Sequence, residues 1–336
     1  LIGGLGDSAV PPAPTFTGRA GFIVPTGIAT DDSTKAFFDA IATKGRIASL
    51  YDFENREKLF PAVDSRMKFC ALTLGKQETA RFVFFATNTA HLRDERRAFT
   101  LSGADIALLN PNTRTCPVFR SQADAELTKK IYRRVPTFRE LGATDNPWRE
   151  NLSRIFDMGK RPEQELAERS QPETSYPMIE AKYFWQFDHR FTSSSLQGDV
   201  ESTDAQKNDA TFSTTTAYWM EIVETERRLA ANNFNQKWII AYRNITNATN
   251  ERTIVAAVIP RYATNYSVRL CLVDAPATKQ AGLLGNLNSL VTDYVARQKL
   301  GGTNLSDYVF RQIAVLTPGH YTPADLDFIV PRVLEL

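Results

Sequence analysis

The sequence predicts an α/β fold made of two parts, and three features of the chain support this prediction. Short β-rich runs alternate with a helical pattern between residues 21 and 74. A polar, proline-bearing stretch at 159–177 has the composition of a linker. β-rich runs return at 237–243 and 253–259 and are followed by a helical pattern that begins near residue 283. The first part is therefore predicted to be α/β and the second α+β.

The elements of the first part follow from local signals. An apolar run at 22–24 predicts a strand that stops at a proline. The segment 31–45 predicts a helix that begins at acidic and hydroxyl residues and ends at a glycine. Further β-rich runs predict strands at 47–51, 68–74 and 81–86.

The middle and last parts of the chain give weaker signals. The run 106–109 is predicted to be a strand followed by a turn, and a helix is predicted from Ser121 to Pro136. The stretch 193–216 is rich in Ser, Thr and Asp, and is predicted to be a long loop. Apolar residues at helical spacing between 283 and 295 predict one helix with a core-facing stripe.

Length and charge are those of an ordinary globular protein. The 336 residues suffice for two domains that each bury a core, and the contents of 43% hydrophobic and 23% charged residues are typical. Because the formal net charge is only +2, a nucleic-acid surface requires an uneven distribution of charge. Basic residues are frequent between 81 and 160, and include Arg93, Arg96, Arg97, Lys129, Lys130, Arg133 and Arg134. A solvated basic helix face explains each of them equally well.

Six segments, taken in order, resemble restriction-modification adenine methyltransferases of the type IIG and phage-exclusion kinds. These segments are GFIVPTGIATDDSTKAFF, SLYDFENREKLFPAVDSRMKFCALTLG, LNPNTRTCPVFRSQADAELTKKIYRRVP, FDHRF, WIIAYRNITNATNERTIVAAVIP and LNSLVTDYVARQKLGGTNL. The resemblance implies that residues 1–115 are the C-terminal part of a Rossmann-like methyltransferase domain. It implies a helical connector and linker at 116–178, and an α+β DNA target recognition domain of the TaqI-like type at 179–336.

The resemblance also implies that the catalytic half lies upstream of this sequence. Adenine methylation requires an acidic residue or Asn followed by Pro-Pro and an aromatic residue, which contact the flipped base. Neither Asn110-Pro111-Asn112-Thr113 nor Asn146-Pro147-Trp148 supplies it, and Gly3-Gly4-Leu5-Gly6 lacks the strand that precedes a donor-binding loop. S-adenosylmethionine is therefore expected only in the full-length parent. No catalytic, cofactor-binding or metal-binding residue is assigned here, and the isolated chain is expected to be inactive as a methyltransferase.

One residue of the first part is expected to contact the target base. By resemblance to adenine methyltransferases with an aromatic residue before the last hairpin, Phe60 is the position expected to stack on the flipped adenine. Phe53 is the second choice. Stacking of a base on an aromatic ring is worth roughly 1–3 kcal/mol. The alternative is that Phe60 is a core aromatic that anchors its loop.

The resemblance places the DNA contacts in the second part, with double-stranded DNA as the partner. Cationic side chains bind phosphates and guanine edges, and glycine lets the backbone approach a phosphate. The residues expected near DNA are Lys182, His189, Arg190, Arg243, Arg252, Arg297, Lys299, Gly301, Gly302 and Asn304. A plain turn at 244–252 and ordinary helix termination at 297–302 are the alternative explanations.

Two other functions remain open. Glu180-Ala181-Lys182 has the spacing found in Mg²⁺-dependent nucleases, with Asp157 as a possible second carboxylate, although such short matches often arise by chance. The third hypothesis is a scaffold that binds protein partners through the surface left exposed by the missing N-terminal methyltransferase half.

Cysteine usage and hydropathy indicate the compartment. Three cysteines at 70, 116 and 271 form no CxxC pair or disulfide framework, which fits a reduced cytosol. No apolar run approaches the roughly 20 residues needed to span a bilayer. The chain is therefore expected to be cytoplasmic, without a membrane partner.

Overall fold

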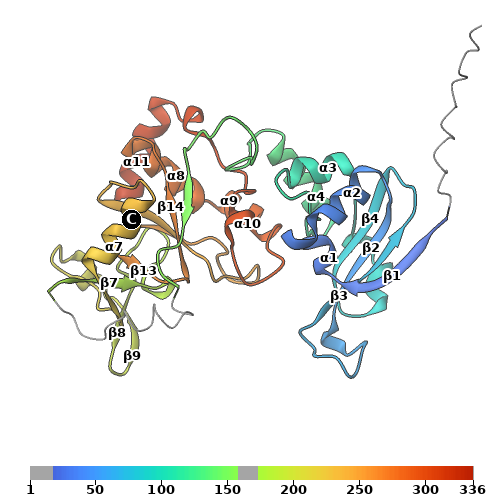
Figure 1. Cartoon of the computed structure of the whole chain (residues 1–336), viewed down its shortest axis with the longest axis horizontal. Helices are drawn as coiled ribbons and strands as arrows, with labels where there is room; N and C mark the ends of the chain where they lie inside the picture. The colour runs from blue at the N-terminus through green and yellow to red at the C-terminus, as the bar shows by residue number, and fades with distance from the viewer. Residues whose placement is uncertain (1–17, 158–172, 336) are drawn as a thin grey trace, which may run out of the picture. The chain divides into compact units, whose positions relative to one another are not determined.

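A computed structural model describes residues 18–157 and 173–335, which divide into two compact units (Figure 1). Unit 1 contains residues 18–107 and 119–122, and unit 2 contains residues 108–118, 123–157 and 173–335. The glycine-rich segment 3–6 and most of the predicted linker at 159–177 lie outside the described residues.

Unit 1 is built on a five-stranded mixed sheet with the strand order β1-β3-β2-β4-β5. The strands are β1 (Ala20–Pro25), β2 (Ile47–Glu54), β3 (Lys68–Leu74), β4 (Thr79–Ala86) and β5 (Ala98–Ser102). β3 is antiparallel to both β1 and β2, β2 and β4 are parallel, and β4 and β5 are antiparallel. The strands predicted at 22–24, 47–51, 68–74 and 81–86 are confirmed.

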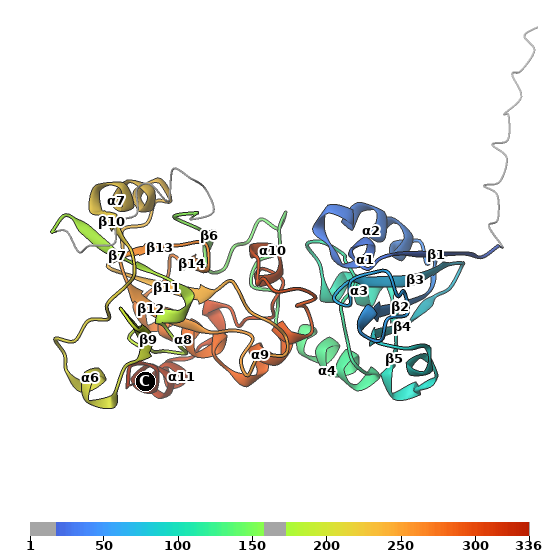
Figure 2. The ribbon, with the colours of Figure 1, turned by 90° about the horizontal axis from the view of Figure 1, so that it is seen from below.

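Two helices lie beside this sheet, α1 (Gly27–Thr30) and α2 (Lys35–Thr43) (Figure 2). Phe38 and Ala42 are the buried residues of α2, in agreement with its amphipathic pattern. Gly45 follows with a φ of 59°, and a Cβ there would lie 2.8 Å from the carbonyl oxygen of Gln77. The predicted helix end at this glycine is confirmed, because both the left-handed backbone and the close approach require glycine.

The prediction of a strand at 106–109 is wrong, because this segment belongs to the helix α3 (Gly103–Leu109). The hydroxyl of Ser102 accepts a hydrogen bond from the Asp105 amide at 3.1 Å, and the Asp105 carboxylate accepts one from the Ser102 amide at 3.0 Å. This reciprocal cap starts a helix. Ile106 and Leu109 are both buried, three residues apart as helical burial requires.

Short 3₁₀ turns complete unit 1, and the helix α4 (Gln122–Tyr132) follows them with all but its first residue in unit 2. The turns are η1 (Asp32–Thr34), η2 (Asn55–Glu57), η3 (Thr89–Arg93) and η4 (Glu95–Arg97). The predicted helix from Ser121 is confirmed as α4, which ends before Pro136.

Unit 2 contains three sheets. A four-stranded sheet has the order β12-β11-β14-β6, a three-stranded sheet has the order β10-β7-β13, and β8 and β9 form a hairpin. The strands are β6 (Asn151–Ser153), β7 (Ser175–Ile179), β8 (Thr192–Ser195), β9 (Gly198–Glu201), β10 (Trp219–Glu221), β11 (Trp238–Arg243), β12 (Ala256–Pro260), β13 (Ala263–Thr264) and β14 (Val268–Leu272). One hydrophobic core joins the two larger sheets, and includes Phe156, Met178, Ile239, Ala257 and Leu270.

The polar stretch 193–216, predicted to be one long loop, contains most of the β8–β9 hairpin and the helix α6 (Asp204–Asn208). Thr203 and Gln206 form a reciprocal cap at the start of α6. The helices that follow are α7 (Ile222–Ala231), α8 (Ala277–Leu287), α9 (Leu290–Arg297), α10 (Asp307–Phe310) and α11 (Pro323–Glu335), with the 3₁₀ turn η6 (Pro318–His320). The 3₁₀ turn η5 (Ala181–Tyr183) lies between β7 and β8.

The single helix predicted over 283–295 is two helices, α8 and α9, separated at Asn288 and Ser289. The side chain of Asn288 donates to the Ala256 carbonyl at 2.8 Å and accepts from the Ala256 amide at 3.0 Å. Ser289 then caps α9 by accepting a hydrogen bond from the Thr292 amide. The break lets one side chain satisfy both backbone groups of a strand residue.

No helix within the described residues has the length and apolar character required to cross a membrane. All three cysteines are buried and free.

Candidate nucleic-acid interface

The loop between β2 and β3 of unit 1 presents Phe60, the residue expected to stack on a target base. The ring of Phe60 packs edge-on against Phe69 with centroids 4.9 Å apart, and Phe69 stacks on Phe53 at 5.2 Å. Phe53 is buried with 5% of its surface exposed, whereas Phe60 is 40% exposed. Phe60 is therefore the open end of an aromatic stack, and Phe53 is a core residue.

A buried asparagine organises this loop. The side-chain amide of Asn55 donates to the carbonyls of Phe60 and Val63, both at 2.9 Å, and its oxygen accepts from the Phe60 amide at 2.9 Å. The backbone on both sides of the Phe60 ring is thus fixed. A ring held in place loses little freedom when a planar ligand stacks on it.

In unit 2, two segments that are far apart in the sequence lie side by side and form what we call the paired-loop surface, residues 244–250 and 301–304. The amide of Thr246 donates to the Thr303 carbonyl at 3.1 Å, and the amide of Leu305 donates to the Asn244 carbonyl at 2.7 Å. Ile245 and Asn304 form an isolated antiparallel bridge between these two bonds.

The exposed residues of the paired-loop surface are glycines and residues with amide or hydroxyl side chains, apart from Ile245, which is 47% exposed. Gly301, Gly302, Thr303 and Asn304 are all exposed, and a Cβ at either glycine would meet no atom within 4 Å. Asparagine and threonine side chains can both donate to and accept from base edges. Exposed glycines let a phosphate approach the backbone closely.

The arginine side chains that flank this surface donate hydrogen bonds to backbone carbonyls of the protein itself. Arg297 donates to the carbonyls of Ala248 at 2.9 Å and Glu251 at 2.5 Å, so it holds the loop 244–252 against α9. Arg252 donates to the carbonyl of Asn288. Both guanidinium groups shape the loop, and neither is directed only to solvent.

Arg243 and Lys299 are further from solvent. The guanidinium of Arg243 donates to the Phe184 carbonyl and lies 4.6 Å from the Trp185 ring, and its burial lowers its pKa to about 10. The ammonium of Lys299 donates to the carbonyl of Leu109 and to the side-chain oxygen of Asn110, and burial lowers its pKa well below the usual value. In this arrangement Lys299 would have to leave both acceptors to reach a phosphate.

Lys182 is held between two carboxylates, 3.1 Å from Glu180 and 3.0 Å from Asp199 of the β8–β9 hairpin. Burial alone would lower the pKa of Lys182, but the hydrogen bonds to Asp199 and Glu180 raise it above the usual value, so the side chain is a cation. Glu180 also accepts from the amide of Asn265 at 2.8 Å.

The nuclease hypothesis lacks a metal-ligand cluster in the part of the chain that the structure describes. No group of three His, Cys, Asp or Glu residues there could hold a metal ion. Asp157, the second carboxylate considered from the sequence, forms an ion pair with Arg154 at 3.4 Å. The oxygens of Glu180 are engaged by Lys182 and Asn265.

His189 and Arg190 line a cavity of 640 Å³ in unit 2, together with Trp238 and Gln280. Burial lowers the pKa of His189, so its imidazole is neutral at pH 7 and contributes no positive charge. Arg190 donates to the carbonyls of Asp209 at 3.0 Å and Lys207 at 2.7 Å, and so holds the end of α6.

Comparisons with known proteins give distant structural likenesses. No protein-family model matches the sequence, and no curated protein matches it. Among solved structures, the chain is similar to the type IIG restriction endonuclease BpuSI, with a TM-score of 0.35 and 10% identity over 95% of this chain and 42% of that chain. It is also similar to the type IIL restriction-modification enzyme MmeI in complex with DNA, with a TM-score of 0.42 and 7% identity over 80% of this chain and 35% of that chain. The chain therefore spans less than half the length of either protein.

The structure also brings together residues that the sequence did not single out as a site. In unit 1, Phe85 of β4 and Arg120 lie together, with the ring centroid 4.3 Å from the guanidinium carbon. Arg96 and Arg97 line the same cavity. The sequence signal was the run of basic residues at 93–97, but nothing in it pointed to Arg120.

Proposed function

We propose that this chain is the sequence-specific DNA recognition portion of a restriction-modification adenine-specific DNA methyltransferase. In this proposal unit 1 belongs to the C-terminal part of a Rossmann-like methyltransferase domain, and unit 2 contains the helical connector and the α+β target recognition domain at 179–336. The paired-loop surface carries the proposal, because it joins two segments of unit 2 into one exposed patch made mostly of amide, hydroxyl and glycine backbone groups.

The sheet of unit 1 supports the methyltransferase part of the proposal. Among the described strands β1 lies at the edge of its sheet, and its apolar side chains Phe22 and Ile23 are 49% and 65% exposed. An apolar edge strand is a site for a further strand to pair. We infer that an upstream half of the parent pairs there and supplies the binding site for S-adenosylmethionine and the catalytic residues.

Phe60 supports contact with a flipped base, and the choice of adenine rests on the sequence resemblance. An exposed aromatic ring on a loop fixed by Asn55 offers a flat platform to a base that has left the stack. The recognition role would then belong to unit 2, and the contact with the flipped base to unit 1.

The test is DNA binding by the full chain, measured by fluorescence anisotropy with a random-sequence duplex over a range of salt concentrations. We expect affinity to fall steeply as salt rises, because phosphate contacts release counterions. Gly302→Asp places a carboxylate on the paired-loop surface without a steric clash, and is expected to weaken binding at least tenfold.

Gly18→Asp is the matched control, because it makes the same charge change at another exposed glycine with open space around it. The proposal predicts that Gly18→Asp binds like the wild type. Absence of DNA binding at low salt, or equal weakening by both variants, would remove the paired-loop surface as the DNA contact. A reading frame upstream of Leu1 that encodes a Gly-rich loop and an Asn-Pro-Pro-aromatic motif would support the methyltransferase assignment.

A further inference from the structure

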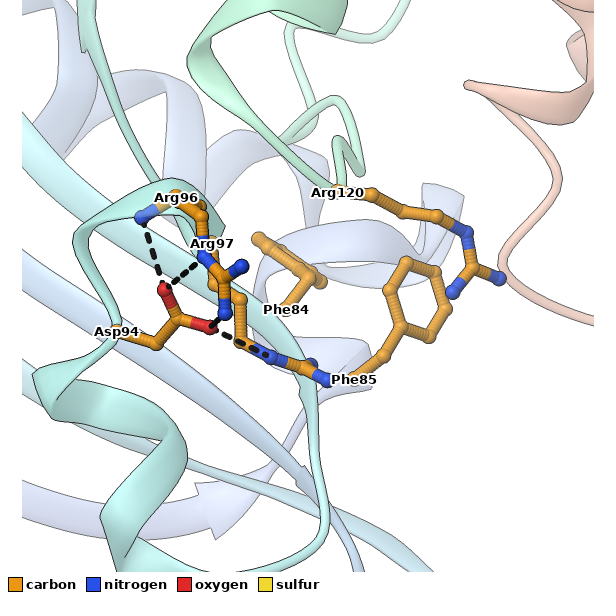
Figure 3. Close-up of a pocket in the computed structure, with 6 residues that line it drawn as sticks. All are labelled: Phe84, Phe85, Asp94, Arg96, Arg97 and Arg120. Atoms are coloured by element: carbon orange, nitrogen blue, oxygen red, sulfur yellow. Dashed lines mark hydrogen bonds and ion pairs between the residues drawn. The ribbon is translucent and has the colours of Figure 1, made fainter.

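A second candidate ligand site lies in unit 1 at the end of β4, and Phe60 is not among the residues that line it. It is a cavity of 320 Å³ lined by two aromatic residues, three arginines and one aspartate. These residues are Phe84, Phe85, Asp94, Arg96, Arg97 and Arg120 (Figure 3). Three guanidinium groups and one carboxylate leave an excess of positive charge at the cavity.

The backbone of Phe85 has a conformation that is rare for a side chain of this size. Its φ is 58°, in the left-handed region, at an irregularity in the pairing of β2 with β4. The amide of Phe85 donates to the buried carboxylate of Asp52 at 3.0 Å, and the hydroxyl of Thr26 donates to the same carboxylate at 2.5 Å. Strain that the surrounding structure maintains in this way is frequent at ligand sites.

Arg120 is the cation best placed to meet a ligand. Its guanidinium carbon lies 4.3 Å from the centroid of the Phe85 ring, and the side chain is exposed. No hydrogen bond or ion pair joins this guanidinium to another residue in the described ranges. A cation–π contact positions a guanidinium while its N–H groups remain able to donate.

The other two arginines share one carboxylate. Asp94 accepts from Arg96 at 2.9 Å through both of its oxygens, and Nε of Arg97 lies 3.9 Å away (Figure 3). The charge of Arg96 is thus balanced by a bidentate ion pair with Asp94, whereas Arg97 has only the longer contact with the same carboxylate. Arg97 and Arg120 are the two groups that an anion could engage without breaking a short ion pair.

We propose that this cavity binds a phosphate group, with Arg120 as the main contact and Arg97 as the second. The planar fork of a guanidinium matches two phosphate oxygens, and two arginines can share the charge of one phosphate. The ring of Phe85 positions Arg120, and Asp52 positions Phe85. A nucleic-acid backbone is the source that the proposed function favours, and only this choice of source rests on that function.

The experiment compares Arg120→Gln and Arg97→Gln with Arg149→Gln in the full chain. Arg149 is a matched control, because its exposed guanidinium pairs with Asp274 in unit 2 and lines neither cavity. Two probes are used, a random-sequence duplex titrated over salt, and inorganic phosphate followed by its phosphorus NMR line width. We expect each cavity variant to reduce the slope of log affinity against log salt by about 0.9, the value of one lost phosphate contact. We expect phosphate line broadening to be lost in both.

The two probes separate the possible sources of the phosphate. One outcome is that the wild type broadens the phosphate line without binding DNA, and that Arg120→Gln does not broaden the line. The site would then bind a free phosphate, so the proposed function would be wrong while the phosphate site would stand. If the cavity variants behave like Arg149→Gln with both probes, the phosphate site is overturned.

Phe85→Gly tests the geometry apart from the charge. Glycine tolerates the positive φ, so the variant is expected to fold, with an unchanged circular dichroism spectrum. All three arginines remain, but Arg120 loses its platform. We expect weaker phosphate line broadening than in the wild type, and equal broadening would overturn the positioning role of the ring.

Discussion

Asp293 and Arg297 form an ion pair within α9, with Nε of Arg297 2.8 Å from the carboxylate of Asp293. The second oxygen of Asp293 accepts from the amides of Thr253 at 2.6 Å and Ile254 at 2.9 Å. Arg297 donates to two carbonyls of the preceding loop. The pair therefore holds the loop 244–252 through the carbonyls of Ala248 and Glu251 and through the amides that follow the loop. This loop contributes the first half of the paired-loop surface.

Asp293→Ala is expected to lower the free energy of unfolding by about 3–5 kcal/mol, as for the loss of one partner of a buried ion pair. Asp293 is only 4% exposed, and its removal leaves two buried amides without an acceptor. Urea unfolding measures this loss.

Asp274→Ala is the control for the loss of a carboxylate. Asp274 pairs with Arg149, and both side chains are largely exposed, so the expected change is below about 1 kcal/mol. Equal changes in the two variants would show that Asp293 does not hold the loop. Hydrogen exchange should also accelerate at the amides of Thr253 and Ile254 in Asp293→Ala.

We expect the wild type to bind a duplex with a mismatched adenine more tightly than a matched duplex, and Phe60→Ala to lose this preference. A mismatched adenine leaves the stack at low cost, and stacking on Phe60 is worth roughly 1–3 kcal/mol, or about 5- to 150-fold in affinity. Competition between mismatched and matched duplexes for the full chain measures the preference. Leu59→Ala is the control, because Leu59 is 38% exposed beside Phe60 and has no aromatic ring. A preference that survives in Phe60→Ala would contradict the stacking role.

Replacement of Phe85 by two small residues measures its backbone strain. Phe85→Ala and Phe85→Gly lose the same ring, but only alanine keeps the cost of a side chain at a φ of 58°. We expect the glycine variant to be more stable than the alanine variant by about 1 kcal/mol in urea unfolding. At an ordinary strand position the glycine variant would be the less stable of the two. The sign of the stability difference therefore shows whether the backbone of Phe85 is strained.

The strands of unit 1 could be predicted from the sequence because each is a β-rich run bounded by local signals. Pro25 ends β1, and Gly45 ends the helix before β2. The helix α3 was missed because its cap depends on Asp105 and Ser102 inside a run that also has strand character. Two short helices replaced one long one because Asn288 bonds to Ala256, a residue 32 positions earlier that periodicity does not include.

The two loops of the paired-loop surface could be located from the sequence. The groups to which their Arg and Lys side chains donate could not be predicted from it. Arg297 and Lys299 follow a helix end, where both DNA contact and an internal role are possible. Their acceptors are Ala248, Glu251 and Leu109, which lie 46 or more residues away in the sequence. Only the tertiary structure decides such partners, and for the same reason Arg120 could not be paired with Phe85 in advance.

Asp52 gives the last prediction, a dependence of stability on pH. Burial raises the pKa of its carboxyl above the usual 3.8, although hydrogen bonds from Thr26 and the Phe85 amide act in the opposite direction. Above pH 3.8 the unfolded chain releases this proton, while the folded chain keeps it up to the raised pKa. The contribution of Asp52 to the free energy of unfolding therefore falls as pH rises through that window.

Asp52→Asn removes this titration, so the stability of the wild type relative to the variant should decrease as pH rises above 3.8. For Asp64→Asn, the stability of the wild type relative to the variant is expected to change with pH in the opposite direction. The hydrogen bond from Arg66 lowers the pKa of Asp64 to about 2, so the advantage of the wild type over Asp64→Asn should increase between pH 2 and pH 4. Urea unfolding over this pH range measures both differences. If the wild type gained stability relative to Asp52→Asn as pH rose, Asp52 would be ionised more easily in the folded chain than in the unfolded one. The buried carboxylate would then owe its charge to its two donors, which would outweigh the loss of solvent around it.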